Sequence, residues 1–201
     1  TPCGTLFPYT TLFRSGLEGK ASAGSISGPL LNTLSQMDGF IHVVRHFTNP
    51  SVPHSEDSVD PLRDISAMET ELMLNDLIIV ERKLERLEEE KQRGGIGRDK
   101  NLVARETALF TRLQEVLSNE TPLRHETFSE DEEKLLSSYG LLSRKPQLIV
   151  INQSEDQEPI EIDTPFANTK AICMPAKLEM EIAQLPSKDA QVFLDEYGIE
   201  E

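Results

Sequence analysis

Basic residues, cysteine and long apolar runs are all scarce in this 201-residue chain. Lys and Arg number 20 against 35 Asp and Glu, and the resulting net charge of −15 argues against general or sequence-specific DNA binding, which needs clustered basic side chains. No apolar run approaches the roughly 20 residues that span a bilayer, so we expect no membrane partner. Cys3 lies in an atypical N-terminal stretch, and the remaining Cys173 cannot form an internal disulfide, which favours a reducing cytoplasm.

Residues 1–15 differ in composition from the remainder of the chain. They are rich in aromatic and hydroxyl side chains, carry one positive charge and no acid, and lack the features of a secretory signal or a transit peptide. Residues 5–15 (TLFPYTTLFRS) are the translation of a DNA sequence that resembles a standard short-read sequencing adapter. We therefore expect 1–15 to be non-native, and we exclude them from the fold prediction.

From residue 16 onward, strand patterns and helix patterns alternate. Apolar, β-branched runs predict three strands, the first two of them buried on both faces: 40–47, 147–151 and 170–175. Four short segments predict helices: 30–36, a segment that begins after Ser129, 177–186 and 187–198. This alternation is typical of an α/β fold.

Between the first two strands, the apolar period changes to that of a long helix. Ser66 and Glu69 have capping-box spacing, which predicts a helix from Ser66 to about residue 93. Its apolar residues are spaced as in a coiled-coil seam: Met73, Leu77, Val80, Leu84 and Leu87. The glycine-rich segment 94–98 ends this helix, and a second helix is expected over 99–119, with one apolar stripe of Leu102, Leu109, Leu113 and Val116. We expect the two helices to form an antiparallel hairpin.

Polar residues follow two of the predicted strands, where ligands bind in open α/β sheets. The sequence NQSE (152–155) follows one strand, and PAKLE (175–179) follows the next. The Asn152 side chain can both accept from and donate to the edge of a base, and the Lys177 stem can lie along a flat ring. An NxxE sequence alone is common in ordinary strand-to-helix turns, but its pairing with Ala176 and Lys177 one strand later favours a base-binding site.

Several short segments, taken in order, resemble the YchF (Obg-like ATPase) family of translation-factor-class P-loop NTPases. VDPLRDI (59–65) and ETELMLNDL (69–77) carry the most specific part of the resemblance. The other matching segments are Gly16 with Leu17, HVVR (42–45), NQSE (152–155) and AKLEMEIAQL (176–185). The resemblance implies a partial G-domain sheet with an inserted antiparallel helical hairpin, a coiled coil. It divides the chain into G-domain residues 16–65, a hairpin at 66–120 and further G-domain residues at 121–201.

The resemblance also implies roles for individual residues. Those that contact the nucleotide base are Asn152, Gln153, Glu155, Ala176 and Lys177. Gly16 and Leu17 correspond to the remnant of a switch motif, and because leucine cannot polarise water, other groups must position the nucleophile. NQSE stands where most GTPases have NKxD, which implies that ATP binds at least as well as GTP. For the full-length parent the resemblance implies hydrolysis with Mg²⁺, association with the ribosome and a cytoplasmic location.

The sequence contains no G-x-x-x-x-G-K-[ST] motif, which would cradle the phosphates and hold Mg²⁺. We therefore expect the chain to be an inactive central fragment that lacks the P-loop and the C-terminal TGS domain and binds no cofactor. The alternative is a non-hydrolysing α/β interaction module that uses its helical hairpin as a docking arm. A P-loop encoded upstream of Gly16 would decide for the enzyme.

Overall fold

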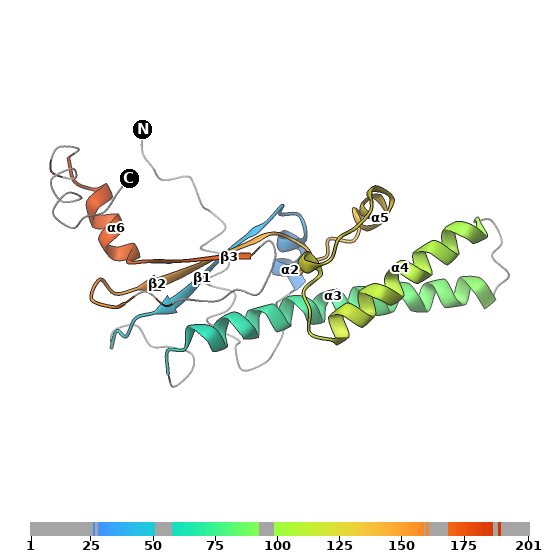
Figure 1. The fold of residues 1–201 in the computed structure, drawn as a ribbon, viewed down its shortest axis with the longest axis horizontal. Coiled ribbons are helices and arrows are strands. Elements are labelled where there is room, and N and C mark those ends of the chain that lie inside the picture. The colour runs from blue at the N-terminus through green and yellow to red at the C-terminus, as the bar shows by residue number, and fades with distance from the viewer. Residues whose placement is uncertain are drawn as a thin grey trace.

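The computed structural model describes residues 26, 28–50, 58–92, 99–158, 160, 169–186 and 189. Its elements are a parallel sheet, a long helical hairpin and several short helices (Figure 1). The sheet has the strand order β1 (Phe40–His46), β2 (Gln147–Gln153) and β3 (Thr169–Met174). The predicted α/β class and all three strands are thus confirmed, whereas residues 1–15 and the helix predicted at 187–198 lie outside the description.

One face of the sheet is packed and the other is half exposed. On the packed face, Val44 of β1 and two β2 isoleucines, Ile149 and Ile151, contact Ile65 of the long helix α3 (Pro61–Gln92). On the opposite face, Ile41 and Val43 are 44% and 53% exposed. The prediction that the first strand is buried on both faces is therefore wrong. Alternate side chains of a strand point to opposite faces, and α3 covers one of them.

Helix α3 begins at Pro61, earlier than the sequence pattern predicted. Asp60 is the N-cap, since its Oδ1 accepts a hydrogen bond from the Arg63 amide at 3.1 Å, and Pro61 suits the first helical position, where no amide donor is needed. The predicted start at Ser66 is wrong, because Ser66 lies inside the helix and Glu69 is buried in an ion pair rather than used in a capping box.

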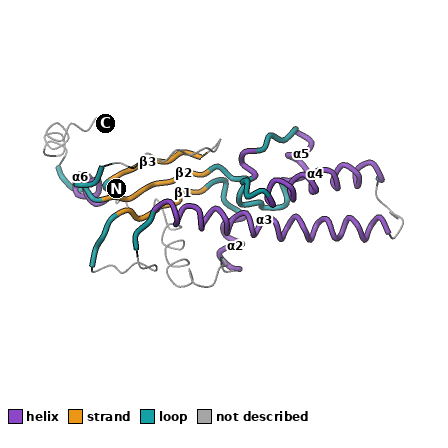
Figure 2. Tube along the Cα trace, turned by 60° about the horizontal axis from the view of Figure 1, so that its bottom comes forward, coloured by secondary structure: helices purple, strands orange, loops and turns teal. Residues whose placement is uncertain are grey.

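Helices α3 and α4 (Lys100–Ser118) lie side by side as an antiparallel pair (Figures 1 and 2). Asp99 caps α4 by accepting a hydrogen bond from the Asn101 amide at 2.9 Å. The apolar seam predicted for α3 is confirmed, with Met73, Val80 and Leu87 buried and with Leu77 and Leu84 partly buried. Facing them, α4 contributes Leu109, Phe110, Leu113 and Leu117 to the same core cluster.

The short helices flank the strands and the hairpin in the chain. Helix α2 (Gly28–Ser35) precedes β1, η1 (Leu123–His125) and α5 (Glu130–Leu136) follow α4, and α6 (Ala176–Ala183) follows β3. The predicted cap of α5 is confirmed, because Ser129 and Glu132 form a reciprocal capping box. The Lys145 ammonium group donates to carbonyl oxygens at the end of α2, those of Leu34 at 2.9 Å, Ser35 at 2.7 Å and Met37.

Two sets of buried polar contacts fasten α3 to the segment that leads into β2. Arg124 of η1 donates to the Glu69 carboxylate at 2.6 Å and 3.3 Å and to the carbonyl of Lys145 at 3.1 Å. Two turns farther along α3, the Asp76 carboxylate accepts from the amides of Leu142 and Ser143, both at 2.7 Å, and from the Ser143 hydroxyl at 2.6 Å. We call these two sets the buried joint.

Charged groups inside the protein have shifted pKa values. Burial raises the pKa of Asp76 to about 6, although the Ser143 hydroxyl and the two amides act in the opposite direction by favouring the carboxylate. Burial also lowers the pKa of His42 on β1 to about 4, against a smaller opposing effect of Asp64. His42 is therefore neutral near pH 7, in keeping with a structural role in the strand.

Candidate functional site

The parallel register brings the ends of β2 and β3 to one edge of the sheet. Asn152 is paired with Met174 in the register, so the residues that follow both strands emerge side by side. Beyond β2 the chain turns at 154–157, and beyond β3 it passes through Pro175 into α6. Figure 1 shows α6 at this edge, at the opposite end of the molecule from the tip of the hairpin.

A hydrogen bond joins the two sequence motifs at this edge. The Asn152 Oδ1 atom accepts from the Ala176 amide at 3.2 Å, across a sequence separation of 24 residues. Because its oxygen holds the start of α6, Asn152 has its Nδ2 group, with two N–H donors, available for a ligand. The arrangement can therefore donate hydrogen bonds to an acceptor such as a ring nitrogen.

Gln153 points away from this edge. Successive side chains of a strand alternate between faces, so Gln153 lies on the face opposite Asn152. It is buried, and its Nε2 group donates to the main-chain carbonyl of Gln157 at 2.9 Å. Within the described part of the chain, the Gln153 Oε1 atom has no hydrogen-bond partner. The Gln153 side chain therefore supports the turn, and a contact of this residue with the base can come from its main chain.

Glu155 and Lys177 extend into solvent on either side of the edge. Glu155 is exposed in the turn after β2. The Lys177 side chain is 84% exposed, and its ammonium group lies 3.7 Å from the Glu181 carboxylate one turn farther along α6. Both side chains are therefore accessible to a ligand beside Asn152.

Gln157 is a residue that the sequence analysis missed. Its Oε1 atom accepts from the Ser154 amide at 2.9 Å, and its own amide donates back to the Ser154 carbonyl at 3.2 Å. The spacing of Ser154 and Gln157 is that of a capping box, in which the fourth residue reaches back to the amide of the first. That spacing is the signal that could have identified Gln157.

Comparisons with known proteins find relatives that match most of this chain. No family model matches the chain. It is 33% identical over 208 residues to the ribosome-binding ATPase YchF of Bacillus subtilis, which covers 98% of this chain and 55% of that protein. It is 34% identical over 155 residues to the Obg-like ATPase homolog of Saccharomyces cerevisiae, which covers 75% of this chain and 38% of that protein. Over most of its length, the chain is similar to YchF/Obg-like ATPases.

A solved structure has the same fold as this chain. The YchF GTPase of Schizosaccharomyces pombe superimposes with a TM-score of 0.76 at 23% identity, over 91% of this chain and 52% of that one. This likeness confirms the predicted fold class, a G-domain-like sheet with its helices. The chain spans about half the length of the curated YchF relatives that it matches in bacteria, 55% in Bacillus subtilis and 52% in Haemophilus influenzae.

Gly16 and Leu17, the expected switch remnant, lie outside the described residues. Among the residues that the structure describes, no group of three or more His, Cys, Asp or Glu side chains could hold a metal ion. Asn152 and its neighbours stay the predicted contacts of a nucleotide base.

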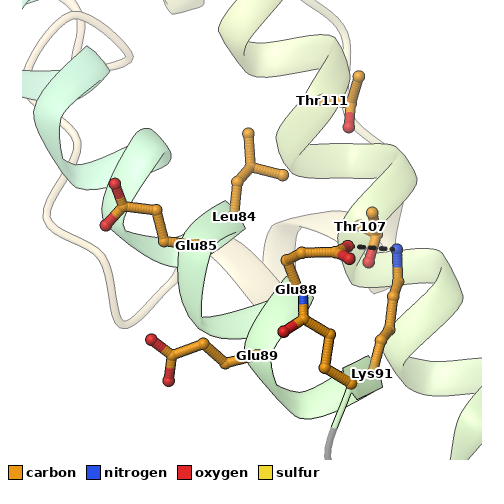
Figure 3. A pocket seen from close by; sticks show the side chains of 8 residues that line it. Leu84, Glu85, Glu88, Glu89, Lys91, Thr107 and Thr111 are labelled. Carbon is orange, nitrogen blue, oxygen red and sulfur yellow. Dashed lines mark ion pairs between the residues drawn. The ribbon is translucent and has the colours of Figure 1, made fainter.

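A cavity lies on the hairpin, away from the base edge. It is an open groove of about 580 Å³ between α3 and α4, lined on α4 by Thr107 and Thr111 (Figure 3). The α3 side contributes Leu84, Glu85, Glu88, Glu89, Lys91 and Gln92. The Lys91 ammonium group lies 3.7 Å from the Glu88 carboxylate, so part of the acidic charge is compensated locally.

Proposed function

We propose that this chain contains the base-binding part of a YchF-type nucleoside triphosphatase, which as a whole protein hydrolyses ATP at least as readily as GTP. The observation that carries the proposal is the hydrogen bond between Asn152 and Ala176, which unites the two motifs at one sheet edge. The names of the relatives, an ATPase in Bacillus subtilis and a GTPase in Schizosaccharomyces pombe, support the same class of reaction.

In this proposal the chain's own residues hold and orient the base. The Asn152 Nδ2 group donates to a ring nitrogen, the Glu155 carboxylate accepts from the exocyclic amino group, and the Lys177 stem covers one ring face. Mg²⁺ bound by the whole protein would supply positive charge against that of the phosphates. Because no described residues fit that ion, we assign this chain no step in the transfer itself.

The choice of ATP rests on Glu155. An aspartate at this position in NKxD accepts two N–H bonds from guanine, and the longer side chain of Glu155 does not reproduce that geometry. Titration of the whole protein with ATP and GTP tests this point, with competition between the two expected. A preference for GTP of about a hundredfold, near 2.7 kcal/mol, would overturn it.

Replacement of Asn152 by Ala should weaken binding of whichever base is held. The change removes the amide donor to the base and also the acceptor that holds the Ala176 amide. Asn101→Ala on α4 is a matched control, since its side chain is exposed on the hairpin. Equal nucleotide affinity of the two variants would show that the base binds elsewhere.

The 201-residue chain by itself should neither hydrolyse a nucleoside triphosphate nor bind one tightly. The base edge offers a few hydrogen bonds, and the sequence has no G-x-x-x-x-G-K-[ST] motif to hold the phosphates. Against the entropy of association, such a site gives roughly millimolar affinity. Calorimetry of residues 16–201 with ATP and Mg²⁺ tests this expectation, and micromolar binding or phosphate release would contradict it.

We further propose that the whole protein associates with ribosomes in the cytoplasm. The support is that the Bacillus subtilis and Haemophilus influenzae relatives are named ribosome-binding ATPases. No helix in the described ranges is long and apolar enough to cross a membrane. Cosedimentation of the whole protein with ribosomes tests the proposal, and recovery of all of it in the ribosome-free fraction would refute it.

The alternative function is a docking module without hydrolysis, and the open acidic groove between α3 and α4 is the observation that favours it. Under this alternative, nucleotides do not bind at the base edge. The titrations of the whole protein therefore also separate the two functions.

A further inference from the structure

The turn after β2 is closed from both sides by one residue, Gln157. Its main-chain amide donates to the Ser154 carbonyl at 3.2 Å, and its side-chain oxygen accepts from the Ser154 amide at 2.9 Å. Its main-chain carbonyl accepts from the Gln153 side chain at 2.9 Å. Three groups of Gln157 thus fix the two residues at the end of the strand.

Glu155 is the second residue of this turn, so the turn determines where its main chain lies and from where its side chain extends. Asn152, by contrast, is held by the sheet, with Arg45 of β1 and Met174 of β3 as its register neighbours. If the turn opens, Asn152 stays in place while Glu155 moves. The two contacts that the base makes therefore depend on different supports.

We propose that Gln157 is a positioning residue of the base site, which holds Glu155 where its carboxylate accepts from the exocyclic amino group of a purine. This inference rests on the proposed base-binding function and extends it to a residue outside both sequence motifs. Gln157 touches no ligand in this proposal. It acts through the Ser154 amide, and the bond that closes the turn is the one between that amide and the Gln157 side-chain oxygen.

The test compares two soluble nucleotides that differ in the exocyclic amino group alone, adenosine monophosphate and purine riboside monophosphate. Each is titrated into the 201-residue chain labelled with ¹⁵N, and the amide signals of 152–157 and 176–177 report binding. The preference of the wild-type chain for adenosine monophosphate measures the contact between Glu155 and the amino group. Loss of one hydrogen bond to the base corresponds to about a twofold to tenfold change in this preference.

Gln157→Ala should reduce this preference by about twofold to tenfold, because the Ser154 amide loses its acceptor. Gln157→Glu keeps an oxygen acceptor and should retain the wild-type preference. Gln114→Ala on α4 replaces a glutamine far from the turn and is the matched control. A purely structural loss in Gln157→Ala would weaken both nucleotides equally and leave the preference unchanged, and that result would overturn the inference.

The remaining outcomes separate this inference from the function on which it rests. Binding of both nucleotides by the wild-type chain without preference would overturn the role given to Glu155 and Gln157, while leaving the base site intact. Absence of any shift at 152–157 and 176–177 with either nucleotide, up to about ten times the expected millimolar dissociation constant, would overturn the base site itself and the inference with it.

Discussion

Replacing Asp76 with Asn tests the buried joint between α3 and the segment before β2. The Asp76 carboxylate is fully buried and accepts from two amides and a hydroxyl, all within 2.7 Å. Asparagine has the same shape but a single acceptor oxygen, and its NH₂ group faces donors. The substitution thus removes one charge and leaves at least one buried donor, the amide of Leu142 or of Ser143, without a partner.

Two opposing effects set the size of the change at pH 7. An unsatisfied buried donor costs about 1–3 kcal/mol. The Asp76 pKa rises from its ordinary 3.8 to about 6 in the folded protein, and a shift of this size means that the buried charge costs about 3 kcal/mol, which asparagine relieves. These terms nearly cancel, so we expect the free energy of unfolding of Asp76→Asn at pH 7 to lie within about 2 kcal/mol of wild type.

The decisive quantity is the difference in free energy of unfolding between wild type and Asp76→Asn, measured as a function of pH. Because the folded pKa of Asp76 lies above the unfolded pKa, the folded wild type takes up a proton as the pH falls through about 6, and this contribution to stability is lost as the pH rises again. Between pH 7 and pH 5, wild type should therefore gain about 1.4 kcal/mol relative to Asp76→Asn, which has no such group.

Urea unfolding followed by far-ultraviolet circular dichroism at pH 7 and pH 5 measures this difference. Asp131→Asn in α5 is the control, because its side chain is exposed and a change of its charge should shift the unfolding free energy by less than about 0.5 kcal/mol. If the deficit of Asp76→Asn were equal at both pH values, or smaller at pH 5, then the hydrogen bonds would outweigh burial and the reasoning would be refuted.

Three other substitutions test the hairpin, the ion pair and the base edge. Leu84→Asp should lower the free energy of unfolding, measured with heat or urea, by more than about 2 kcal/mol, because it places a charge in the apolar seam. The control Ile78→Asp, at a site 46% exposed on the same helix, should lower it far less. Equal losses would show that Leu84 does not lie in a buried seam. Glu69→Gln should cost about 3–5 kcal/mol because Arg124 stays buried without its counter-charge, and unfolding of the Glu69→Leu, Arg124→Met double variant should recover most of that loss. Asn152→Ala should speed hydrogen exchange of the Ala176 amide, measured by NMR, because the variant lacks the oxygen that accepts from this amide. Unchanged exchange would show that this bond is not formed in solution.

Features with a local period were predictable from the sequence, and features that depend on distant partners were not. The seam through Val80 and Leu87 follows from apolar spacing along one helix, and the structure buries both residues. The spacing of Ser66 and Glu69 is also local, yet the helix start that it predicted at Ser66 is wrong, because Glu69 binds Arg124, 55 residues away. No period in a single sequence encodes such a pairing.

The candidate site shows the same division. The order of strands placed Asn152 and Ala176 at one sheet edge, and the structure brings them within hydrogen-bonding distance. Which side of Asn152 is used, and the support from Gln157, depend on side-chain geometry that composition and spacing do not specify. Likewise, the continuous apolar run of β1 could not reveal that Ile41 and Val43 lie on a half-exposed face. The separate domain boundaries predicted at 65 and 120 stay predictions.

Helix α3 is a single rod shared by the sheet and the hairpin. Its 32 residues contain no glycine and no proline after Pro61, so it has none of the usual sites of a kink. At 1.5 Å per residue it is about 48 Å long. Ile65 lies against Ile151 near the strand ends that carry the candidate site, while Leu87 lies far out in the hairpin. When α3 rotates as a rigid rod about its N-terminal end, a displacement of about 8 Å at its far end corresponds to a rotation of about 10° beneath those strand ends.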